Sequence, residues 1–109
     1  MTTLPDTIST FLTAHAADDV EATLVTLAPD AVVTDQGSTF RGTDEIDSFL
    51  RTAASEYTYT TELTGSERVD DEHWIARIRI EGNFPGGIAD LAYRFTLVDG
   101  LITELHIGA

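Results

Sequence analysis

The chain has 109 residues, of which 42% are hydrophobic and 8% aromatic, a composition that suits one folded domain with a single core and not a disordered chain. It contains no cysteine, which excludes disulfides, thiolate chemistry and cysteine-based zinc sites. Six arginines and no lysine stand against 19 acidic residues, and the resulting net charge of −13 predicts that nucleic acid is repelled.

The acidity has two interpretations: a surface solvated for a salty cytoplasm, or an acidic surface for a basic partner. Because the acidic residues are scattered along the chain, the first is favoured, and a halophilic or high-GC source would fit the use of arginine alone. The opening MTTLPDTIST has no basic segment before a long apolar one, and no stretch is long enough to cross a bilayer. A cytoplasmic protein without membrane contact is therefore expected.

Two helices are predicted first. Residues 5–17 have the periodicity of an amphipathic helix, which places His15 on the apolar face with Ile8, Phe11 and Leu12. The following DDVEATLVTLAPD has capping-box spacing between Asp18 and Glu21, and Val20, Leu24 and Leu27 form an apolar stripe at helical spacing. A helix is therefore predicted from there until Pro29 stops it.

A short strand and a third helix come next. The run AVVTD, residues 31–35, reads as a strand that ends in a carboxylate, and Gly37 begins a turn into a short extended piece at residues 39–41. Thr43 is expected to cap a helix whose buried face carries Ile46, Phe49 and Leu50.

From residue 56 onward the pattern is that of strands. Four alternating runs cover residues 56–69, 73–82, 88–98 and 101–108, and Asp99-Gly100 between the last two is a strong hairpin signal. The order of elements predicts an α+β fold in which helices pack on a curved antiparallel sheet. Alternation assigns the helix-facing side of the sheet to two sets of residues. These are Trp74, Ala76, Ile78 and Ile80 on one strand, and Leu91, Tyr93 and Phe95 on the next.

The segment LAPDAVVTDQGSTFRGTDEIDSFL after a helical pair, with strands to the end, resembles the nuclear transport factor 2 superfamily. Its SnoaL-like polyketide cyclases and ketosteroid isomerases are the nearest in pattern. The sharpest part is the acid at the end of the first strand, followed by glycine, Arg41-Gly42 and a helix with Ile46 and Phe49. The resemblance implies a single SnoaL-like domain over residues 1–109, a cone-shaped α+β barrel of the cystatin-like type with three helices in the first half.

The resemblance also implies a role for Asp35, because a ketosteroid isomerase uses the aspartate at this strand end to remove a proton next to a carbonyl. The two groups that hold the enolate there, a tyrosine and a protonated aspartate, align with Phe11 and Leu91. Both donors are missing, so a standard ketosteroid isomerase is not expected.

A candidate site follows from the faces of the strands. Carrying the pairing through the Asp99-Gly100 hairpin places Glu104 and His106 toward the pocket. They may equally lie on the outer face, because Leu105 and Ile107 also favour burial and a last strand can be buried on both sides. The predicted catalytic groups are Asp35, His15 and His106. The predicted substrate-binding residues are Phe11, Phe49, Trp74, Leu91, Tyr93 and Glu104.

Plainer interpretations stand beside this site. Asp35 could serve an Asx-turn before Gly37, and Tyr57, Tyr59 and Trp74 could be ordinary sheet packing. The NFPGG segment, residues 83–87, could be a lid or a simple connection between strands. No local spacing resembles a metal or cofactor motif, and neither is expected.

Two functions remain at this point. The first is a small-molecule enzyme that moves a proton on a hydrophobic substrate, as an isomerase, cyclase, lyase or hydrolase, with Asp35 or a histidine as the base. The second is a noncatalytic ligand-binding or dimeric accessory domain. In either case a homodimer is expected through the outer sheet face, where Ile75 and Ala92 lie among Arg77, Arg79 and Arg94.

Overall fold

A computed structural model describes residues 4–35, 37–56 and 59–108, with only the backbone described for residues 53–56. In the first half of the chain, the helices α1 (Asp6–Ala16) and α2 (Val20–Leu24) come before two strands, and the helix α3 (Gly42–Glu56) follows them. The strands are β1 (Leu27–Asp35), β2 (Ser38–Arg41), β3 (Tyr59–Arg68), β4 (His73–Gly82), β5 (Ile88–Val98) and β6 (Leu101–Gly108). This order confirms the predicted α+β class. None of the described helices is both long and apolar enough to span a bilayer.

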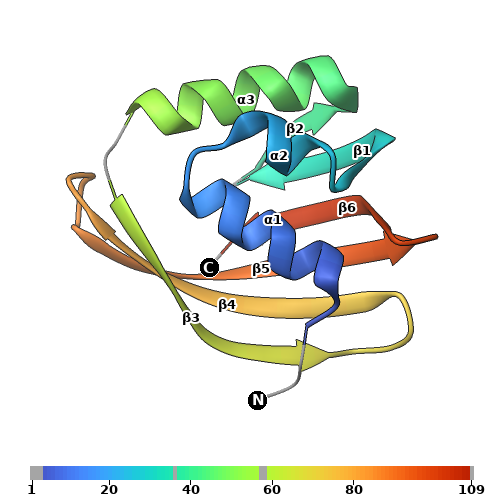
Figure 1. Ribbon diagram of the computed structural model, residues 1–109. Helices are drawn as coiled ribbons and strands as arrows, with labels where there is room; N and C mark the ends of the chain where they lie inside the picture. The colour runs from blue at the N-terminus through green and yellow to red at the C-terminus, as the bar shows by residue number, and fades with distance from the viewer. Residues whose placement is uncertain (1–3, 36, 57–58, 109) are drawn as a thin grey trace.

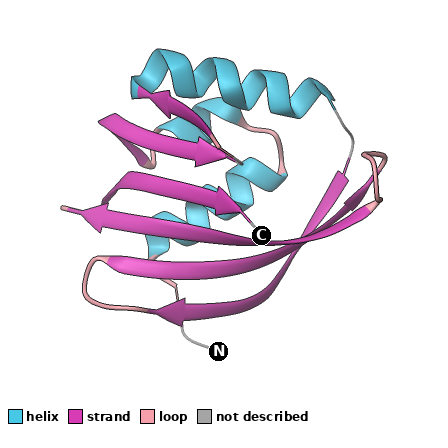
Figure 2. Ribbon diagram, turned by 180° about the vertical axis from the view of Figure 1, so that it is seen from behind, coloured by secondary structure: helices cyan, strands magenta, loops and turns pink. Residues whose placement is uncertain are grey.

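The six strands form one curved sheet in the order β2-β1-β6-β5-β4-β3, and the helices lie on one side of it (Figure 1). Seen from behind, the strands β4, β5 and β6 lie in front of α1 (Figure 2). The sheet is mixed, because β1 pairs with β6 in parallel while the other neighbours are antiparallel. Its edges, β2 and β3, are not paired with each other. The predicted packing of three helices on a curved sheet is therefore confirmed, and the sheet itself is open and mixed, with one parallel pair.

The second helix is shorter than predicted. It ends at Leu24, and the chain joins the sheet at once, because the amide of Ile102 donates to the carbonyl of Thr26 at 2.9 Å. Leu27 is buried in the core as the first residue of β1, so tertiary burial overrides its helical periodicity. Pro29 then lies in β1 where the register with β6 shifts, a position at which a ladder N–H is not needed.

The helix starts also differ by one residue from the predictions. Asp19 and not Asp18 caps α2, since its Oδ1 accepts from the amide of Ala22 at 3.1 Å. The third helix begins at Gly42, ahead of Thr43, and the Glu45 carboxylate reaches back to accept from the amide of Arg41 at 3.0 Å. That contact satisfies a backbone N–H just before the helix, as a capping side chain does, but from one residue further along than in a capping box.

The Asp99-Gly100 turn is as predicted, but the strand after it is not. Both turn residues have positive φ, 54° and 79°, as a two-residue hairpin turn requires. Thr103 is then left unpaired, because Leu97 opposes Ile102 while Thr96 opposes Glu104. One bulged residue reverses the faces of the rest of the strand.

The bulge corrects the predicted placement of two site residues. Beyond Thr103, Leu105 and Ile107 point to the core, whereas Glu104 and His106 are exposed on the outer face. His106 lies opposite the exposed Arg94 of β5. Neither Glu104 nor His106 therefore faces the helices.

The core lies between the helices and the concave face of the sheet. On β4 and β5 the predicted alternation is confirmed, since Arg77, Arg79 and Arg94 are exposed while their neighbours on the other face are buried or half-buried. Ala92, expected on the outer surface, is buried with 4% of its side chain exposed. The residues that form the core are Leu4, Ile8, Phe11, Leu27, Ala28, Ala31, Val33, Ile46, Leu50, Ala76, Ile78, Tyr93, Phe95, Leu97, Ile102, Leu105 and Ile107.

Candidate active site

Asp35 is the last residue of β1 and lines a cavity of about 580 Å³ between the helices and the sheet. It follows Ala31 and Val33, both buried on the helix-facing side, so two-residue alternation carries its side chain to the same side. The walls are mostly apolar. The other lining residues are His15, Ser38, Phe49, Tyr59, Ile80, Phe84, Pro85, Ile88, Ala89, Leu91, Tyr93 and Ile107.

The Asp35 carboxylate is poorly solvated. Its Oδ1 atom is buried and has no hydrogen-bond partner in the part of the chain that the structure describes. Burial raises the pKa of Asp35 above its ordinary value, and the charge that His106 can carry lowers it in part. An oxygen used by a turn would be hydrogen-bonded, so this atom is available to a group in the cavity.

His15 comes from the last turn of α1 and reaches the same cavity. Its ring stacks on Phe11, with 5.5 Å between ring centroids, and lies 6.4 Å from the ring of Tyr93. Burial lowers the pKa of His15, and the nearby Asp18 carboxylate raises it in part. The imidazole is therefore neutral at pH 7, with one N–H donor and one acceptor nitrogen.

Two tyrosines complete the polar lining, Tyr93 from β5 and Tyr59 from β3. The pKa of Tyr93 is raised by burial first and then by Tyr59 and Asp35, while that of Tyr59 is raised by burial, Asp18 and Asp35. Both phenols therefore remain protonated and can donate a hydrogen bond. The electrostatic influence of Asp35 on both tyrosines places the three groups in one neighbourhood.

Tyr59 is the site residue that sequence reasoning assigned to sheet packing. The signal that could have identified it is alternation, because Thr61 and Leu63 follow it on the same face of β3 and both line a cavity under α1. Tyr57, considered with it, lies outside the described residues.

The apolar walls come from α3, the sheet and the β4–β5 turn. Phe49 of α3 stacks on Phe40 of β2 with 4.5 Å between ring centroids, which fixes one wall. Phe84 and Pro85, from the NFPGG segment, form another part of the lining. The turn holds this position through the amide of Gly87, which donates to the carbonyl of Phe84 at 3.0 Å.

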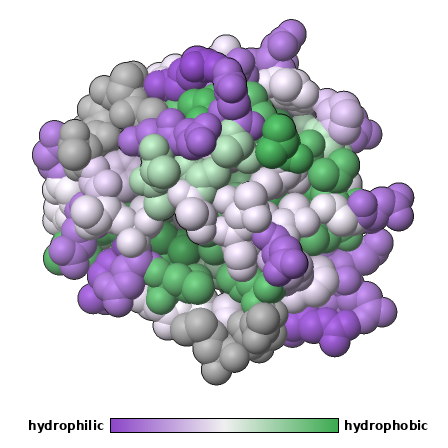
Figure 3. All heavy atoms as spheres, viewed as in Figure 1, coloured by the Kyte–Doolittle hydropathy of each residue, from purple (hydrophilic) through white to green (hydrophobic). Residues whose placement is uncertain are grey.

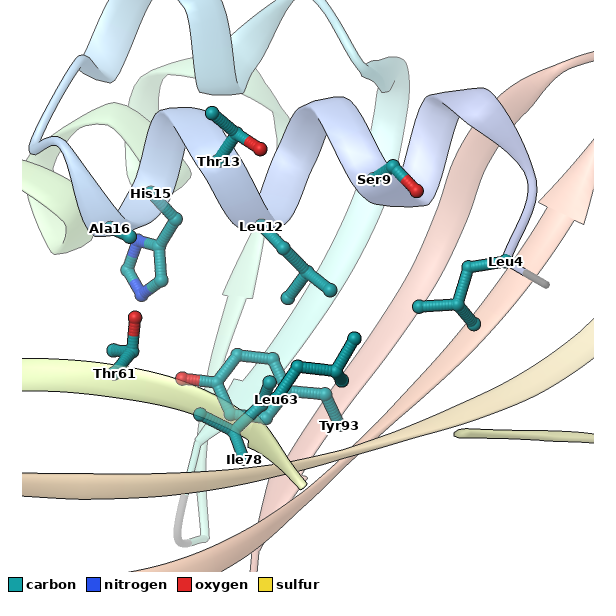
Figure 4. A pocket seen from close by; sticks show the side chains of 10 residues that line it. All are labelled: Leu4, Ser9, Leu12, Thr13, His15, Ala16, Thr61, Leu63, Ile78 and Tyr93. Carbon is teal, nitrogen blue, oxygen red and sulfur yellow. The ribbon is translucent and has the colours of Figure 1, made fainter. Parts of the chain in front are cut away.

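A second cavity of about 270 Å³ lies between α1 and β3 and shares His15 and Tyr93 with the first (Figure 4). We call it the α1–β3 cavity, and the larger one the Asp35 cavity. Its other lining residues are Leu4, Ser9, Leu12, Thr13, Ala16, Thr61, Leu63 and Ile78.

The structure brings together only part of the predicted site. Asp35, His15, Phe49, Leu91 and Tyr93 all line the Asp35 cavity. Four predicted residues lie elsewhere. Phe11 is a core residue that meets Phe95 edge to face at 5.5 Å, Trp74 packs on the core at the far end of β4, and Glu104 and His106 lie on the outer face.

The arrangement suits proton transfer in an apolar space. One carboxylate with a raised pKa stands beside a neutral imidazole and two protonated phenols, so the site offers a base and several neutral hydrogen-bond donors. Among the side chains that the structure describes, those of residues 4–35, 37–52 and 59–108, no three His, Asp or Glu gather as a metal-binding group.

Comparison with known proteins places the chain in a family. The family model of the SnoaL-like domain matches residues 8–105. The crystal structure of a proposed polyketide cyclase from Sinorhizobium meliloti is 35% identical, has a TM-score of 0.90, and covers 96% of this chain and 95% of its own. No curated protein matches the sequence.

More distant structures share the fold. A protein of Catenulispora acidiphila with a ketosteroid isomerase-like fold, crystallised with trimethylamine, is 17% identical with a TM-score of 0.86, covering 98% of this chain and 87% of its own. TerC, co-crystallised with polyporic acid, is 17% identical with a TM-score of 0.82, covering 94% of this chain and 88% of its own.

Proposed function

Since the chain belongs to the SnoaL-like domain family, we propose that it is a small-molecule enzyme in which Asp35 removes a proton from carbon in an apolar carbonyl compound. The family fixes the type of fold and not the reaction, because related sites on one fold carry out different chemistry. The proposal therefore depends on the cavity itself.

The single observation that carries the proposal is the state of Asp35. Its carboxylate faces an apolar cavity, its Oδ1 lacks a partner in the described chain, and burial raises its pKa toward the range in which a carboxylate is an effective base. A carboxylate kept only for stability would have its buried oxygens hydrogen-bonded.

The reaction can be followed proton by proton. An Asp35 oxygen takes the proton from the carbon next to the carbonyl, and the C–H electron pair moves to form a carbon–carbon double bond and an enolate oxygen. The neutral N–H of His15, or the hydroxyl of Tyr93 or Tyr59, donates a hydrogen bond to that oxygen. When the substrate also has a carbon–carbon double bond beside that carbon, the enolate is a dienolate. The protonated Asp35 then returns its proton to the far carbon of the dienolate, which moves the double bond into conjugation with the carbonyl and completes an isomerisation.

The relatives support a small molecule as the ligand. The Sinorhizobium meliloti relative is a proposed polyketide cyclase, and two structures of the same fold were crystallised with small molecules, trimethylamine in one and polyporic acid in the other. The volume of the Asp35 cavity, about 580 Å³, lies in the range of roughly 300–1,000 Å³ that is usual for such ligands.

A direct test uses 5-nitrobenzisoxazole, a small flat compound whose ring opens when a base removes the C–H proton of its isoxazole ring. The C–H electrons form the nitrile, the N–O bond breaks, and the single product is a coloured cyano-nitrophenolate. We expect the protein to accelerate this reaction, with a rate that rises with pH as Asp35 ionises and a midpoint above the ordinary value of about 3.9. Asp35→Asn should lower kcat/KM by at least about 100-fold.

The matched control is Asp30→Asn, which makes the same change at an exposed position of the same strand. It should leave the rate and its pH midpoint unchanged. Equal rates for the wild type and Asp35→Asn, or a midpoint at the ordinary carboxylate value, would overturn the assignment of Asp35 and favour a noncatalytic ligand-binding domain.

We further propose a homodimer formed through the outer sheet face. Half-buried Ile75 lies there among the exposed Arg77, Arg79 and Arg94, so the face combines apolar and charged surface as an isologous interface does. Light scattering at micromolar concentration should give twice the chain mass of 11.8 kDa, and Ile75→Glu should give the mass of the monomer. A wild-type protein with the monomer mass would contradict this proposal.

A further inference from the structure

We infer that the α1–β3 cavity is a subsite for an uncharged aliphatic tail of the substrate, whose reacting carbonyl end lies in the Asp35 cavity. The inference rests on the proposed function of the Asp35 cavity. It adds the class of substrate: an elongated molecule with a flat carbonyl-bearing head and an alkyl tail.

Continuity between the two cavities is the first argument. His15 and Tyr93 line both of them, so the α1–β3 cavity begins where the polar part of the Asp35 cavity ends. Figure 4 shows the imidazole of His15 pointing from α1 toward the hydroxyl of Thr61, with the hydroxyl of Tyr93 directed to the same end of the cavity. A carbonyl oxygen held at this junction would leave the rest of the molecule free to extend under α1.

The lining of the α1–β3 cavity determines the chemistry of the tail. None of its ten residues carries an acidic or an arginine side chain, and its one titratable base, His15, is held neutral by burial. Leu12 and Leu63 point into it from opposite sides, α1 and β3 (Figure 4). A charged tail would find no partner there, and an anionic one would be repelled by a chain of net charge −13.

An exposed apolar surface marks the open side of the cavity. Leu63, a large apolar residue that lines the α1–β3 cavity, lies on the edge strand β3 and is 40% exposed. In Figure 3, viewed as in Figure 1, apolar atoms gather below α1 on the side toward β3. An alkyl chain laid against this surface would remove it from water, which is favourable in proportion to the area covered.

Size argues for a subsite over a separate site. The volume of about 270 Å³ is below the roughly 300 Å³ at which pockets for whole small molecules begin, whereas the adjoining Asp35 cavity lies within that range. The smaller cavity therefore extends the larger one and takes a chain of a few carbons.

The test measures binding, not turnover, with phenyl alkyl ketones from acetophenone to hexanophenone, followed by NMR titration of the protein. For the wild type we expect affinity to rise up to about fourfold for each added methylene, the factor that corresponds to full burial of one CH₂. Leu63→Trp, which fills the α1–β3 cavity from an edge strand, should abolish this rise while leaving the affinity for acetophenone unchanged.

Val98→Trp is the matched control, because Val98 is also 40% exposed on a strand but lines neither cavity. It should keep the wild-type dependence on chain length. If Leu63→Trp does not fold, Leu12→Trp fills the same cavity from α1 and should give the same result. A chain-length dependence that is equal in the wild type and the filled variants, or a wild type without any such dependence, would overturn the subsite.

The outcomes separate this inference from the proposed function. Asp35→Asn should keep the chain-length dependence, since the tail does not touch the carboxylate. If the elimination of 5-nitrobenzisoxazole does not require Asp35 but Leu63→Trp abolishes the dependence, the subsite stands and the base assignment falls. If the elimination requires Asp35 and the dependence survives in Leu63→Trp, the base assignment stands and the subsite falls.

Discussion

The two faces of the sheet shift the pKa of an aspartate side chain in opposite directions. Asp35, on the helix-facing side, has its pKa raised by burial. Asp90, on the outer face, has its pKa lowered because Arg79 holds both of its oxygens, with Nε–Oδ1 at 2.8 Å and Nη2–Oδ2 at 3.3 Å. The difference shows that position in this fold, and not residue type, decides the direction in which the pKa of a carboxyl group is shifted.

The charged groups of the two sides also differ in number and pairing. The exposed side chains of β3 and β4 form a second cross-strand pair, in which Arg77 Nη2 lies 3.3 Å from Glu67 Oε1. In the turn before β4, His73 Nδ1 lies 2.7 Å from Asp70 Oδ1. The inner side has few ionisable groups, which lie in apolar surroundings. A charge on the outer face is thus one of many and is well solvated, whereas a charge on the inner face is poorly solvated and has few charged neighbours.

The largest effect should come from salt, which acts on the surface as a whole. A net charge of −13 repels itself, and added ions screen that repulsion over about 10 Å at 0.1 M ionic strength. We expect Tm to rise by several degrees from low to molar KCl, since about 1 kcal/mol of relieved repulsion corresponds to roughly 4–8 °C for a domain of this size. Thermal unfolding would show it, and choline chloride should act similarly. A flat or falling curve would contradict this view of the surface.

Asp35→Asn should stabilise the protein at neutral pH. The folded state binds the Asp35 proton more tightly than the unfolded chain, so ionisation above about pH 3.9 destabilises the fold progressively as pH rises through the raised pKa. Removing the buried charge should therefore add to the free energy of unfolding at pH 7. The expected gain is only about 1 kcal/mol, because solvent screens part of the effect of burial.

The stabilisation by Asp35→Asn should vanish below pH 3.9, where the wild-type carboxyl is protonated in both states. Urea unfolding at pH 7 and pH 3.5 gives the comparison, with Asp30→Asn as the control. A loss of stability at pH 7 would mean that the carboxylate has stabilising partners.

A second pH-dependent effect is expected at His15. Its lowered pKa means that the unfolded chain takes up a proton first on acidification, so the wild type loses stability as the pH falls below about 6.5. His15→Phe should change the free energy of unfolding by less than about 1.5 kcal/mol at pH 7.5, since its volume is similar, and should remove this part of the acid dependence. Urea unfolding from pH 7.5 to 5 measures the difference. Parallel curves for wild type and variant would contradict a buried neutral imidazole.

The smallest effect is expected on the outer face. Asp90→Asn breaks the pair with Arg79, but both side chains are well exposed and the pair lies among other charges. We expect no measurable change in Tm at 0.15 M salt, because exposed ion pairs contribute little to stability. A clear loss of Tm would show that the outer face depends on individual pairs and not on its charge as a whole.

Much of this fold follows from local patterns, and the errors have local causes. Alternation in β4 and β5 gives the right faces because both strands are regular and one side is buried. The pairing carried through the hairpin predicts the wrong face for Glu104 and His106, because Thr103 bulges. The apolar residues Leu105 and Ile107, which also favour burial, are the sequence signal for the alternative, but they do not identify the bulged residue. The end of α2 was placed too late because Leu27 fits a helical stripe as well as it fits the core. For the site, the position of Asp35 was predictable, but the convergence of β3 on it was not, because that depends on the curvature of the sheet.

The place of β6 in the sheet has a consequence for how the chain folds. The β3 to β6 strands follow one another as hairpins, whereas β1, formed some 70 residues earlier, pairs with none of β3, β4 or β5 and joins the sheet through β6 alone. Such a pairing closes a long loop, so we expect the hairpins to assemble early and the β1–β2–α3 part to dock late, with β6 as the template. Asp35 sits at the end of the strand that docks last. The Asp35 cavity would then form only in the final step of folding. A chain released before β6 is made would lack that cavity and also the part of the core that Ile102, Leu105 and Ile107 supply.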